Sequence, residues 1–201
     1  CCSTSSEWAL SSEDLDGAIM CPDAAERLAE RDGRFEVVGP CLLNSDVLVT
    51  RAGETPTHVG VAHKRSYQAA LVRELFGEQC RTTSMLPSSL PFALARELVD
   101  AIVLDGLRAI SIPEPRLVSA LGGQKVVTYV LTIRKDLQRS DSFRPFVDEY
   151  GRTASALNDP GLLAHWVREL RGVTWGEKEI REWKSLNVQF VSPWMVDSPA
   201  Q

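Results

Sequence analysis

Strand-like and helix-like spacings of apolar residues alternate through the middle of the chain. Strand-like runs cover residues 58–63, 81–86 and 100–106. Between them, residues 65–76 and 89–98 carry apolar side chains at the three- and four-residue spacing of a helix. The order strand, helix, strand, helix, strand predicts parallel strands joined by right-handed crossovers, which is the α/β class.

The segments on either side predict a second group of elements. Residues 15–21 have the pattern of a short buried strand, and Pro22 opens a helical pattern that ends near Gly33. Two β-rich runs follow, up to the turn residues at 52–57. The remaining predictions are a weak helix near 115–121, a long strand at 125–137, helices at 141–156, 159–171 and 176–185, and a last strand at 187–191.

Composition narrows the class of protein. The chain has 201 residues, of which 44% are hydrophobic and 24% charged, so it is long enough to bury a sizeable core. The formal net charge is −5, and no basic stripe marks a nucleic-acid partner. No apolar run approaches the roughly 18 residues that cross a bilayer. The start, CCSTSS, has neither the basic nor the apolar region of a signal peptide.

The five cysteines do not predict a metal site. No pair has the CxxC spacing typical of zinc ligands, and His58 and His63 point to opposite faces of one predicted strand. Cys21 and Cys41 lie in apolar runs where small buried thiols are common, although the odd count leaves one disulfide open. We predict neither a metal nor a cofactor.

A weak internal repeat relates residues 4–21 to residues 88–105 at an offset of 84. Each unit has a hydroxyl pair, a short helix with an inward aromatic residue (Trp8 or Phe92), an acidic turn and a buried strand. Hydroxyl pairs before such helices are typical N-caps, and helix N-termini attract anions and polar ligands. The repeat predicts two similar α/β lobes whose hydroxyl pairs face one cleft.

The repeat also bears on the N-terminus. A strand, a helix and a strand precede Ser88, whereas only three residues precede Thr4, so we expect the first lobe to lack its first strand and helix. A lipid on Cys1 is the alternative explanation of the opening residues, because mature lipoproteins begin with Cys and small polar residues. The helix-start interpretation places Thr4 and Ser5 inside the fold and leaves no tether for such an anchor.

Four stretches carry a resemblance to a known family: STSSEWALSSEDLDGAI, HVGVAHKRSYQAALVRELFG, MLPSSLPFALARELVDAIVLDG and TYVLTIRKDLQRSDSFRPFVDEY. They resemble the type II periplasmic solute-binding proteins of ABC transporters, a group that includes nitrate, sulfonate and thiamine-precursor binders. The resemblance implies an α/β protein with two lobes, mixed and mostly parallel sheets, and helices on both sheet faces. Residues 1–48 and 125–201 would form an incomplete, discontinuous first lobe, and residues 49–124 the second.

The resemblance implies a function without chemistry on the ligand. The protein would bind a small solute in the interlobe cleft and deliver it to an ABC-type permease. It would be a periplasmic or otherwise extracytoplasmic monomer, although the sequence leaves a cytoplasmic location open. An enzyme on the same scaffold, like some menaquinone-pathway enzymes, and a ligand-sensing domain are the rivals. The enzyme would need an acid or base in the cleft, for which His63, Asp23 and Asp105 are the candidates.

Predicted ligand contacts lie at strand ends and helix starts. Lys64 and Arg65 favour an anionic group, whereas Asp23 and Asp105 favour a cationic or hydroxyl-rich one, and the sequence does not decide between them. Ser66 is expected to cap its helix, and Asn44 and Asp46 lie in the expected hinge, where they suit an Asx turn. The predicted binding residues are Thr4, Ser5, Asp23, Asn44, His63, Lys64, Arg65, Ser66, Ser88, Ser89 and Asp105.

Overall fold

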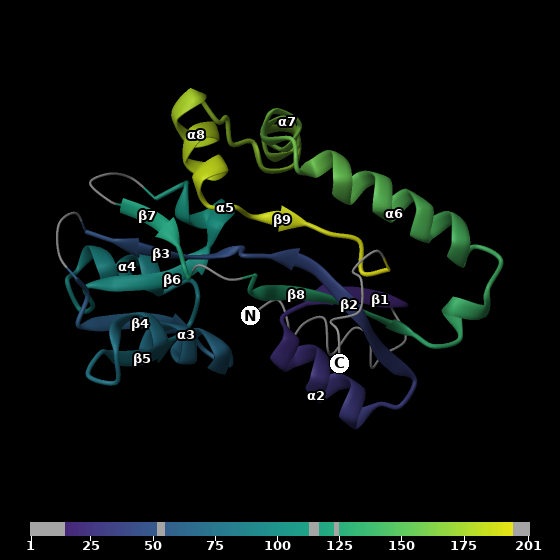
Figure 1. The fold of residues 1–201 in the computed structure, drawn as a ribbon, viewed down its shortest axis with the longest axis horizontal. Coiled ribbons are helices and arrows are strands. Elements are labelled where there is room, and N and C mark those ends of the chain that lie inside the picture. Colours follow the sequence, from purple (N-terminus) through teal and green to yellow (C-terminus); the bar gives the residue numbers. More distant parts are fainter. Residues whose placement is uncertain (1–14, 52–54, 113–116, 123–124, 195–201) are drawn as a thin grey trace. The chain divides into compact units, whose positions relative to one another are not determined.

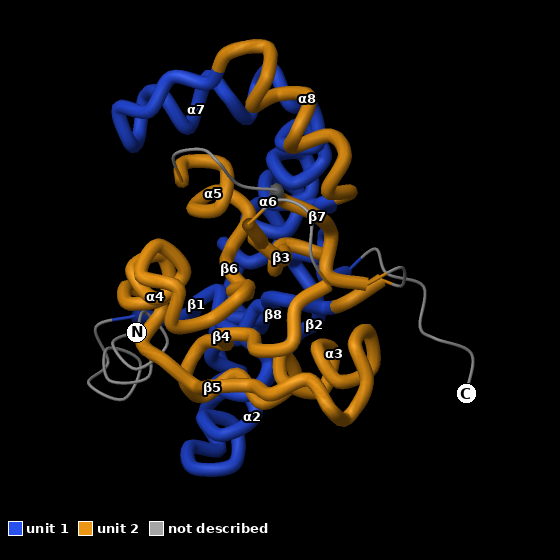
Figure 2. The backbone as a smooth tube through the Cα atoms, turned by 90° about the vertical axis from the view of Figure 1, so that its left-hand side faces the viewer, with its two compact units in different colours: residues 1–43, 127–175, 188–201 blue, residues 44–126, 176–187 orange. Residues whose placement is uncertain are grey.

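A computed structural model describes residues 15–51, 55–112, 117–122 and 125–194 (Figure 1). The chain forms two compact units, which Figure 2 colours separately. Unit 1 comprises Cys1–Leu43, Val127–Trp175 and Val188–Gln201, and unit 2 comprises Asn44–Val126 and Gly176–Asn187. Both units mix helices with a β-sheet, which confirms the predicted α/β class.

The division differs from the predicted boundaries at two places. Strand β3 (Asp46–Thr50) belongs to unit 2, because it pairs along its length with the neighbouring strands of that sheet. Helix α8 (Glu177–Ser185) also belongs to unit 2, where Trp183 is buried on it and Leu186 directly after it. Neither assignment is visible from local sequence, since both depend on long-range partners.

Unit 2 is built on a five-stranded sheet in the order β5-β4-β6-β3-β7. Strand β4 (His58–Ala62) lies parallel to β5 (Arg81–Met85) and to β6 (Ala101–Asp105), as the alternating pattern predicts. Strand β3 runs antiparallel to β6 and to β7 (Leu117–Ala120). Residues 115–121 were expected to be a weak helix, and this prediction is wrong, because strand pairing with β3 overrides the local helical spacing.

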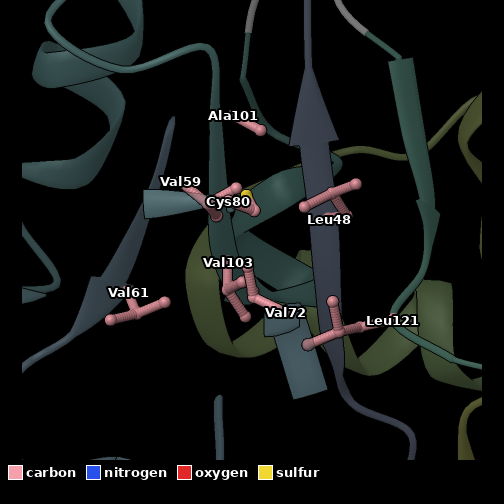
Figure 3. Close-up of a cluster of buried hydrophobic side chains, with 8 residues drawn as sticks. All are labelled: Leu48, Val59, Val61, Val72, Cys80, Ala101, Val103 and Leu121. Carbon is pink, nitrogen blue, oxygen red and sulfur yellow. The ribbon is translucent and has the colours of Figure 1, made fainter. Parts of the chain in front are cut away.

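Helices cover both faces of this sheet. Helix α3 (Ser66–Phe76) buries Val72 in one core, whose members are shown in Figure 3: Leu48, Val59, Val61, Val72, Cys80, Ala101, Val103 and Leu121. Helix α4 (Leu90–Ala95) lies against the opposite face, where Gly60 and Ile102 point. A Cβ at Gly60 would lie 2.8 Å from Leu90 Cδ2, so glycine allows this close approach.

The cap residues of unit 2 explain where its short helices stop and start. Helix α3 ends at Gly77, which has a φ of 84° that other residues rarely adopt. Helix α5 (Gly106–Ala109) begins where the carboxylate of Asp105 accepts a hydrogen bond from Leu107 N. Gly176 is the N-cap of helix α8, and its N–H donates to Glu179 Oε2.

Unit 1 has a four-stranded sheet in the order β1-β8-β2-β9, with antiparallel pairing between the described neighbours. These strands are Gly17–Met20, Val127–Arg134, Phe35–Leu43 and Gln189–Phe190. Helix α2 (Pro22–Arg31) packs on one face through Ala24, Ala25 and Leu28, which meet Phe35 and Val130. The parallel pairs of the described sheets are therefore confined to unit 2. The sheets are mixed, as expected, but most of the described strand pairs are antiparallel rather than parallel.

The C-terminal helices complete unit 1. A 3₁₀ turn (Leu137–Arg139) precedes α6 (Phe143–Leu157) and α7 (Pro160–Arg171). Helix α7 is capped by the Asp159 carboxylate, which accepts from Leu162 N, and ends at Gly172 with a φ of 66°. Trp194 packs edge-on against the three rings of Phe143, Phe146 and Tyr150, which all lie along α6.

The described cysteines are buried in the two cores and form no disulfide. Cys21 and Cys41 are buried, as expected for thiols in apolar runs, and Cys80 is buried as well. Burial raises the pKa of Cys41 to about 11, so the thiol stays protonated and unreactive at neutral pH. Among the described residues, no helix is long and apolar enough to cross a membrane.

Candidate functional site

The ends of the parallel strands in unit 2 gather most of the predicted ligand-binding residues. Residues 63–66 follow β4, residues 86–89 follow β5, and Asp105 ends β6. Asp46 begins the antiparallel strand β3 and pairs in register with Asp105, so it lies at the same side of the sheet. We call this set the carboxyl edge of unit 2.

The strand order makes this edge a suitable ligand site. From β4 the chain moves through α3 to β5 on one side, and then through α4 to β6 on the other side of β4. In open α/β sheets, ligands bind beyond the carboxyl ends of the strands at such a reversal of strand order. The β4–α3 segment and the end of β6 flank the reversal in unit 2.

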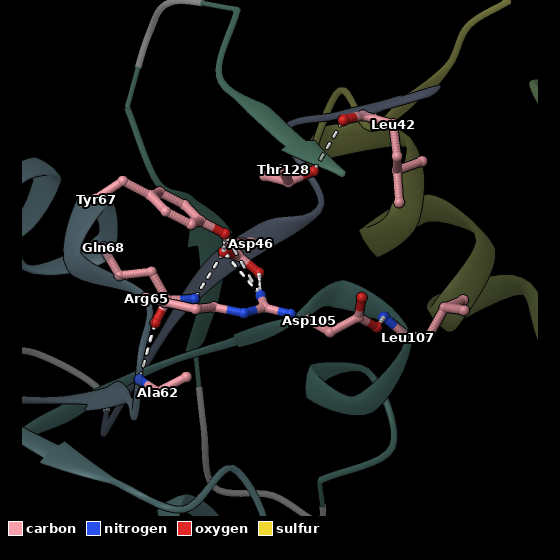
Figure 4. Close-up of polar contacts among 9 residues, drawn as sticks. All are labelled: Leu42, Asp46, Ala62, Arg65, Tyr67, Gln68, Asp105, Leu107 and Thr128. Atoms are coloured by element: carbon pink, nitrogen blue, oxygen red, sulfur yellow. Dashed lines mark hydrogen bonds and ion pairs between the residues drawn. The ribbon is translucent and has the colours of Figure 1, made fainter. Parts of the chain in front are cut away.

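A buried carboxylate organises the β4–α3 segment (Figure 4). Asp46 accepts hydrogen bonds from Arg65 NH1 at 2.8 Å, from the Tyr67 hydroxyl at 2.5 Å and from Gln68 Nε2 at 2.6 Å. Gln68 Oε1 in turn accepts from Ala62 N at 2.8 Å. The side chains of Asp46 and Arg65 are 1% and 9% exposed, so the charges neutralise each other inside the protein.

The sequence pattern placed Asp46 in a hinge turn and did not predict this buried ion pair. The sequence signal was a charged residue at the start of the strand DVLVT, whose residues are all buried and, apart from Thr50, otherwise apolar. A charge at such a position requires a partner. Arg65 was predicted to contact a ligand, but the guanidinium is committed to Asp46 through NH1. Arg65 therefore stabilises the β4–α3 segment, which carries the exposed side chains of His63 and Lys64.

His63, Lys64 and Ser66 are exposed in that segment. His63 N donates to Met85 O at 2.7 Å, and Nδ1 lies 3.2 Å from Ser84 Oγ, so His63 bridges the ends of β4 and β5. Lys64 has a φ of 63°, in the left-handed region. Within the described part of the chain, its ammonium group forms no ion pair. Lys64 is thus a cation that the fold presents to solvent at the carboxyl edge.

The predicted capping roles of the serines are not confirmed. Arg65 rather than Ser66 occupies the N-cap of α3, and no side chain caps that helix. Ser89 is at the N-cap of α4, but its backbone is helical and its hydroxyl makes no capping bond. Ser88 and Ser89 are exposed beside the end of β5. Phe92 was expected to point inward and is 57% exposed instead, because Leu90 and Leu94 fill the buried side of this short helix.

Two predicted ligand residues have structural roles. Asp105 caps α5 as described above. Asn44, with a φ of 58°, accepts a hydrogen bond from Val126 N at 2.9 Å and donates one to Asn187 O at 3.1 Å. Because unit 2 begins at Asn44 and its two segments end at Val126 and Asn187, this amide holds together three points where the chain enters or leaves the unit.

The remaining predicted residues lie elsewhere. Asp23 is in the first turn of α2 in unit 1. Thr4 and Ser5 lie outside the described residues, as does most of the first half of the repeat. The carboxyl edge of unit 2 therefore unites His63, Lys64, Arg65, Ser66, Ser88, Ser89 and Asp105.

A second polar cluster lies at the opposite, amino edge of the same sheet. His58 Nε2 lies 2.8 Å from Thr83 Oγ1, and Arg81 donates to His58 Nδ1 at 3.0 Å. Asp100 accepts from the Thr57 hydroxyl and from the backbone N–H groups of Thr57 and His58. Partial burial and the Arg81 charge lower the pKa of His58, although Asp100 opposes them.

This cluster predicts a pH dependence of stability. Because the pKa of His58 is lower in the folded state than its ordinary value of 6.5, the unfolded state takes up the proton more readily. We expect the free energy of unfolding to be highest above pH 6.5 and to fall as the pH drops from 6.5 through the folded-state pKa. Urea titrations across this range should show the decline in the native chain and a weaker one in His58→Gln. His165→Gln, at an exposed histidine of unit 1, is the control. An identical decline in His58→Gln would contradict the assignment.

The fold matches solved structures from ABC transport systems. A ligand-binding component of an ABC-type import system from Staphylococcus aureus, solved with zinc bound, is 15% identical, with a TM-score of 0.62 over 92% of this chain and 70% of that one. An ABC transporter protein from Parabacteroides distasonis is 11% identical, with a TM-score of 0.70 over 92% of this chain and 71% of that one. No family model and no curated protein matches the sequence.

These likenesses define the class of fold. The chain has the fold of the ligand-binding component of an ABC-type import system, in agreement with the fold that its sequence resemblance implies. The zinc of the staphylococcal protein belongs to that protein. Among the residues described in the present chain, no group of three or more histidine, cysteine or acidic side chains is placed to hold a metal ion.

Proposed function

We propose that this protein binds a small anionic solute at the carboxyl edge of unit 2 and delivers it to an ABC-type permease. The observation that carries the proposal is the exposed ammonium of Lys64, which has no ion-pair partner among the described residues and lies beside the reversal of strand order. The fold supports a binding role, since the structures it matches include the ligand-binding component of an import system.

The charges at this edge favour an anion over a cation. The Asp46 carboxylate is neutralised by Arg65, and the Asp105 carboxylate already accepts a backbone hydrogen bond. Helix α3 has no acidic residue in its first turn and no side-chain cap, so the positive end of its dipole adds to Lys64. A carboxylate, sulfonate or phosphate group is the complementary chemistry. Exposed hydroxyls of Ser88 and Ser89 supply further hydrogen bonds.

Native mass spectrometry of protein purified without added ligand tests the binding role. We expect a bound small molecule in unit stoichiometry, released unchanged on mild denaturation. An enzyme on this scaffold would instead release a chemically altered product when given that molecule. Absence of any bound molecule, together with no thermal shift from a panel of carboxylates, sulfonates and phosphates, would contradict the proposal.

Lys64→Asn tests the assigned residue. Asparagine tolerates the left-handed backbone at this position, so the fold should be kept. Loss of one charge-assisted hydrogen bond should weaken binding of the released solute by about 10- to 100-fold. Isothermal titration calorimetry measures the change. Arg73→Gln, an exposed cation in the last turn of the same helix, is the matched control and should bind normally. Equal affinity in both variants would move the site away from Lys64.

The proposed partners and location follow from this role. Delivery to a permease requires an extracytoplasmic protein, soluble or tethered, and the proposal includes that location. Reconstitution of candidate permeases in proteoliposomes would show solute-dependent stimulation of ATP hydrolysis by this protein. If the protein binds the solute but does not stimulate ATP hydrolysis by any candidate permease, delivery to a permease is contradicted, and the protein binds its ligand for another partner.

A further inference from the structure

An arginine and a histidine meet at the amino edge of unit 2 with no anion between them. Arg81 begins β5, the outermost strand at one side of the described sheet, and is exposed. Its Nη2 donates a hydrogen bond to His58 Nδ1 at 3.0 Å. No carboxylate among the described residues forms an ion pair with Arg81. A guanidinium group is built to donate two N–H groups at once to a carboxylate or a phosphate, and this one donates to an imidazole instead.

These hydrogen bonds fix the protonation of the His58 ring. Arginine is always protonated, so Arg81 can only donate and His58 Nδ1 must accept. Nε2 therefore carries the single ring proton, which it donates to Thr83 Oγ1 at 2.8 Å. A second ring proton, at Nδ1, would point at the guanidinium. His58 can thus become an imidazolium only if Arg81 moves away from Nδ1.

The sheet holds the ring in this position. His58 lies opposite Arg81 in the register of β4 and β5, and Gly60 lies opposite Thr83. Because residues two apart share one face of a strand, all four residues are on the same face of the sheet. Gly60 has no side chain, so the His58 ring can extend along the strand to Thr83. The ring is therefore fixed through Nε2, while Nδ1 faces an exposed side chain that is free to move.

We propose that Arg81, His58 and Thr83 form a binding site for phosphate or for the phosphoryl group of a small molecule. The anion inserts between the guanidinium and Nδ1 of a protonated His58, and it replaces their direct hydrogen bond. Arg81 and Nδ1–H then both donate to the anion, while Thr83 keeps the ring in place. His58 takes its added proton from the solvent. This site lies at the edge opposite Lys64, so it does not depend on the proposed solute site.

The charges around the ring support this site. The charged groups that act on His58 are Arg81 and Asp100, and Arg81 has the larger effect on its pKa. The Asp100 carboxylate already accepts hydrogen bonds from the Thr57 hydroxyl and from the N–H groups of Thr57 and His58. Cys80 stays a neutral thiol, because burial raises its pKa. An anion beside the ring offsets the charge of Arg81, so anion binding and proton uptake favour each other.

Two cationic donors side by side favour a doubly charged anion. A phosphoryl group carries a charge of about −1.5 to −2 at neutral pH and has three acceptor oxygens. A carboxylate has one charge and two oxygens, so it satisfies the pair less completely. We therefore expect phosphate and sulfate to bind more tightly than acetate.

NMR titration of the histidine rings tests the site, because His58, His63 and His165 are the three histidines of the chain. Sulfate is the first probe, since it keeps its double charge over the range of about pH 5 to 8 in which histidine titrates. Saturating sulfate should raise the titration midpoint of His58 by roughly one pH unit, which corresponds to about 10-fold tighter binding to the protonated ring. The midpoint of His165, in unit 1, should stay where it is. Equal shifts of all three histidines would overturn the proposal.

Two arginine variants make this test specific. Arg81→Gln should abolish the rise at His58 and leave any shift of His63, at the carboxyl edge, unchanged. Arg73→Gln, which removes the same charge from an exposed position of α3, should keep the rise. A full rise in Arg81→Gln, or a shift confined to His63, would overturn the site.

Calorimetry in two buffers of different ionisation enthalpy measures the proton. Near neutral pH and at constant ionic strength, binding of sulfate should take up close to one proton per anion. His58→Gln should bind at least about 10-fold more weakly and take up none, because it loses one charge-assisted hydrogen bond. Tighter binding of glycerol phosphate than of inorganic phosphate would assign the site to a phosphorylated small molecule, and the reverse order to free phosphate. Binding without proton uptake, or equal affinity for acetate and sulfate, would overturn the proposal.

Discussion

Replacing Asp46 with alanine should lower the free energy of unfolding of unit 2 by about 3–5 kcal/mol, because removing one member of a buried ion pair leaves the other charge without compensation. Arg65, Tyr67 and Gln68 would each lose the acceptor they now share. The β4–α3 segment would lose its anchor to β3, and Lys64 would no longer be presented in a defined position.

Hydrogen exchange and denaturant titration together measure this effect. Exchange should accelerate at the amides of β3, β4 and β6, while α2 and β8 of unit 1 keep their protection. Glu97→Gln is the control, because Glu97 pairs with Arg51 at 2.6 Å but is 73% exposed, and it should cost less than about 1 kcal/mol. Similar losses in the two variants would mean that the buried network contributes no more than a surface pair.

Replacing Trp183 with alanine should destabilise unit 2 by a comparable amount, about 3–5 kcal/mol, as is usual for deleting a large buried side chain. Trp183 is 5% exposed and lies against Gly106, where a Cβ would be only 3.1 Å from its ring. We expect α8 to lose its protection from hydrogen exchange first, because Trp183 is the buried side chain within that helix.

A double-mutant cycle makes this prediction specific. Gly106→Ala should also destabilise unit 2, since its methyl group would crowd the Trp183 ring. In Gly106→Ala/Trp183→Ala the added methyl group lies in the space that the Trp183 ring has left. The double variant should therefore lose less free energy of unfolding than the sum of the two single losses. Lys184→Ala, at the exposed neighbour on the same helix, should change stability by under about 0.5 kcal/mol. Strict additivity would show that α8 is held to unit 2 by other contacts.

The local spacing of apolar residues was enough to predict those helices and strands whose signals lie within one segment. The alternation from residue 58 to 106 predicted the parallel strands β4, β5 and β6 with their two helices, because each element buries one face at its own periodicity. The helices at 143–157 and 160–171 were expected for the same reason, and the second also has a cap at each end. The carboxyl ends of β4 and β5, with His63, Lys64, Ser88 and Ser89, follow from the order of those elements.

Only the tertiary structure decided features that depend on distant partners. Residues 117–120 form a strand because β3 offers them a pairing edge, and α8 joins unit 2 because Trp183 finds a buried place beside Gly106. Asp46 and Arg65 are 19 residues apart, and no periodicity of the sequence indicates that the two charges pair in the interior. The periodicity of a segment indicates which of its faces is buried. Which element packs against that face depends on how the whole chain folds. For this protein, the sequence determined most of the elements and the edge where a ligand is expected, and the tertiary structure decided which charges at that edge are paired within the protein.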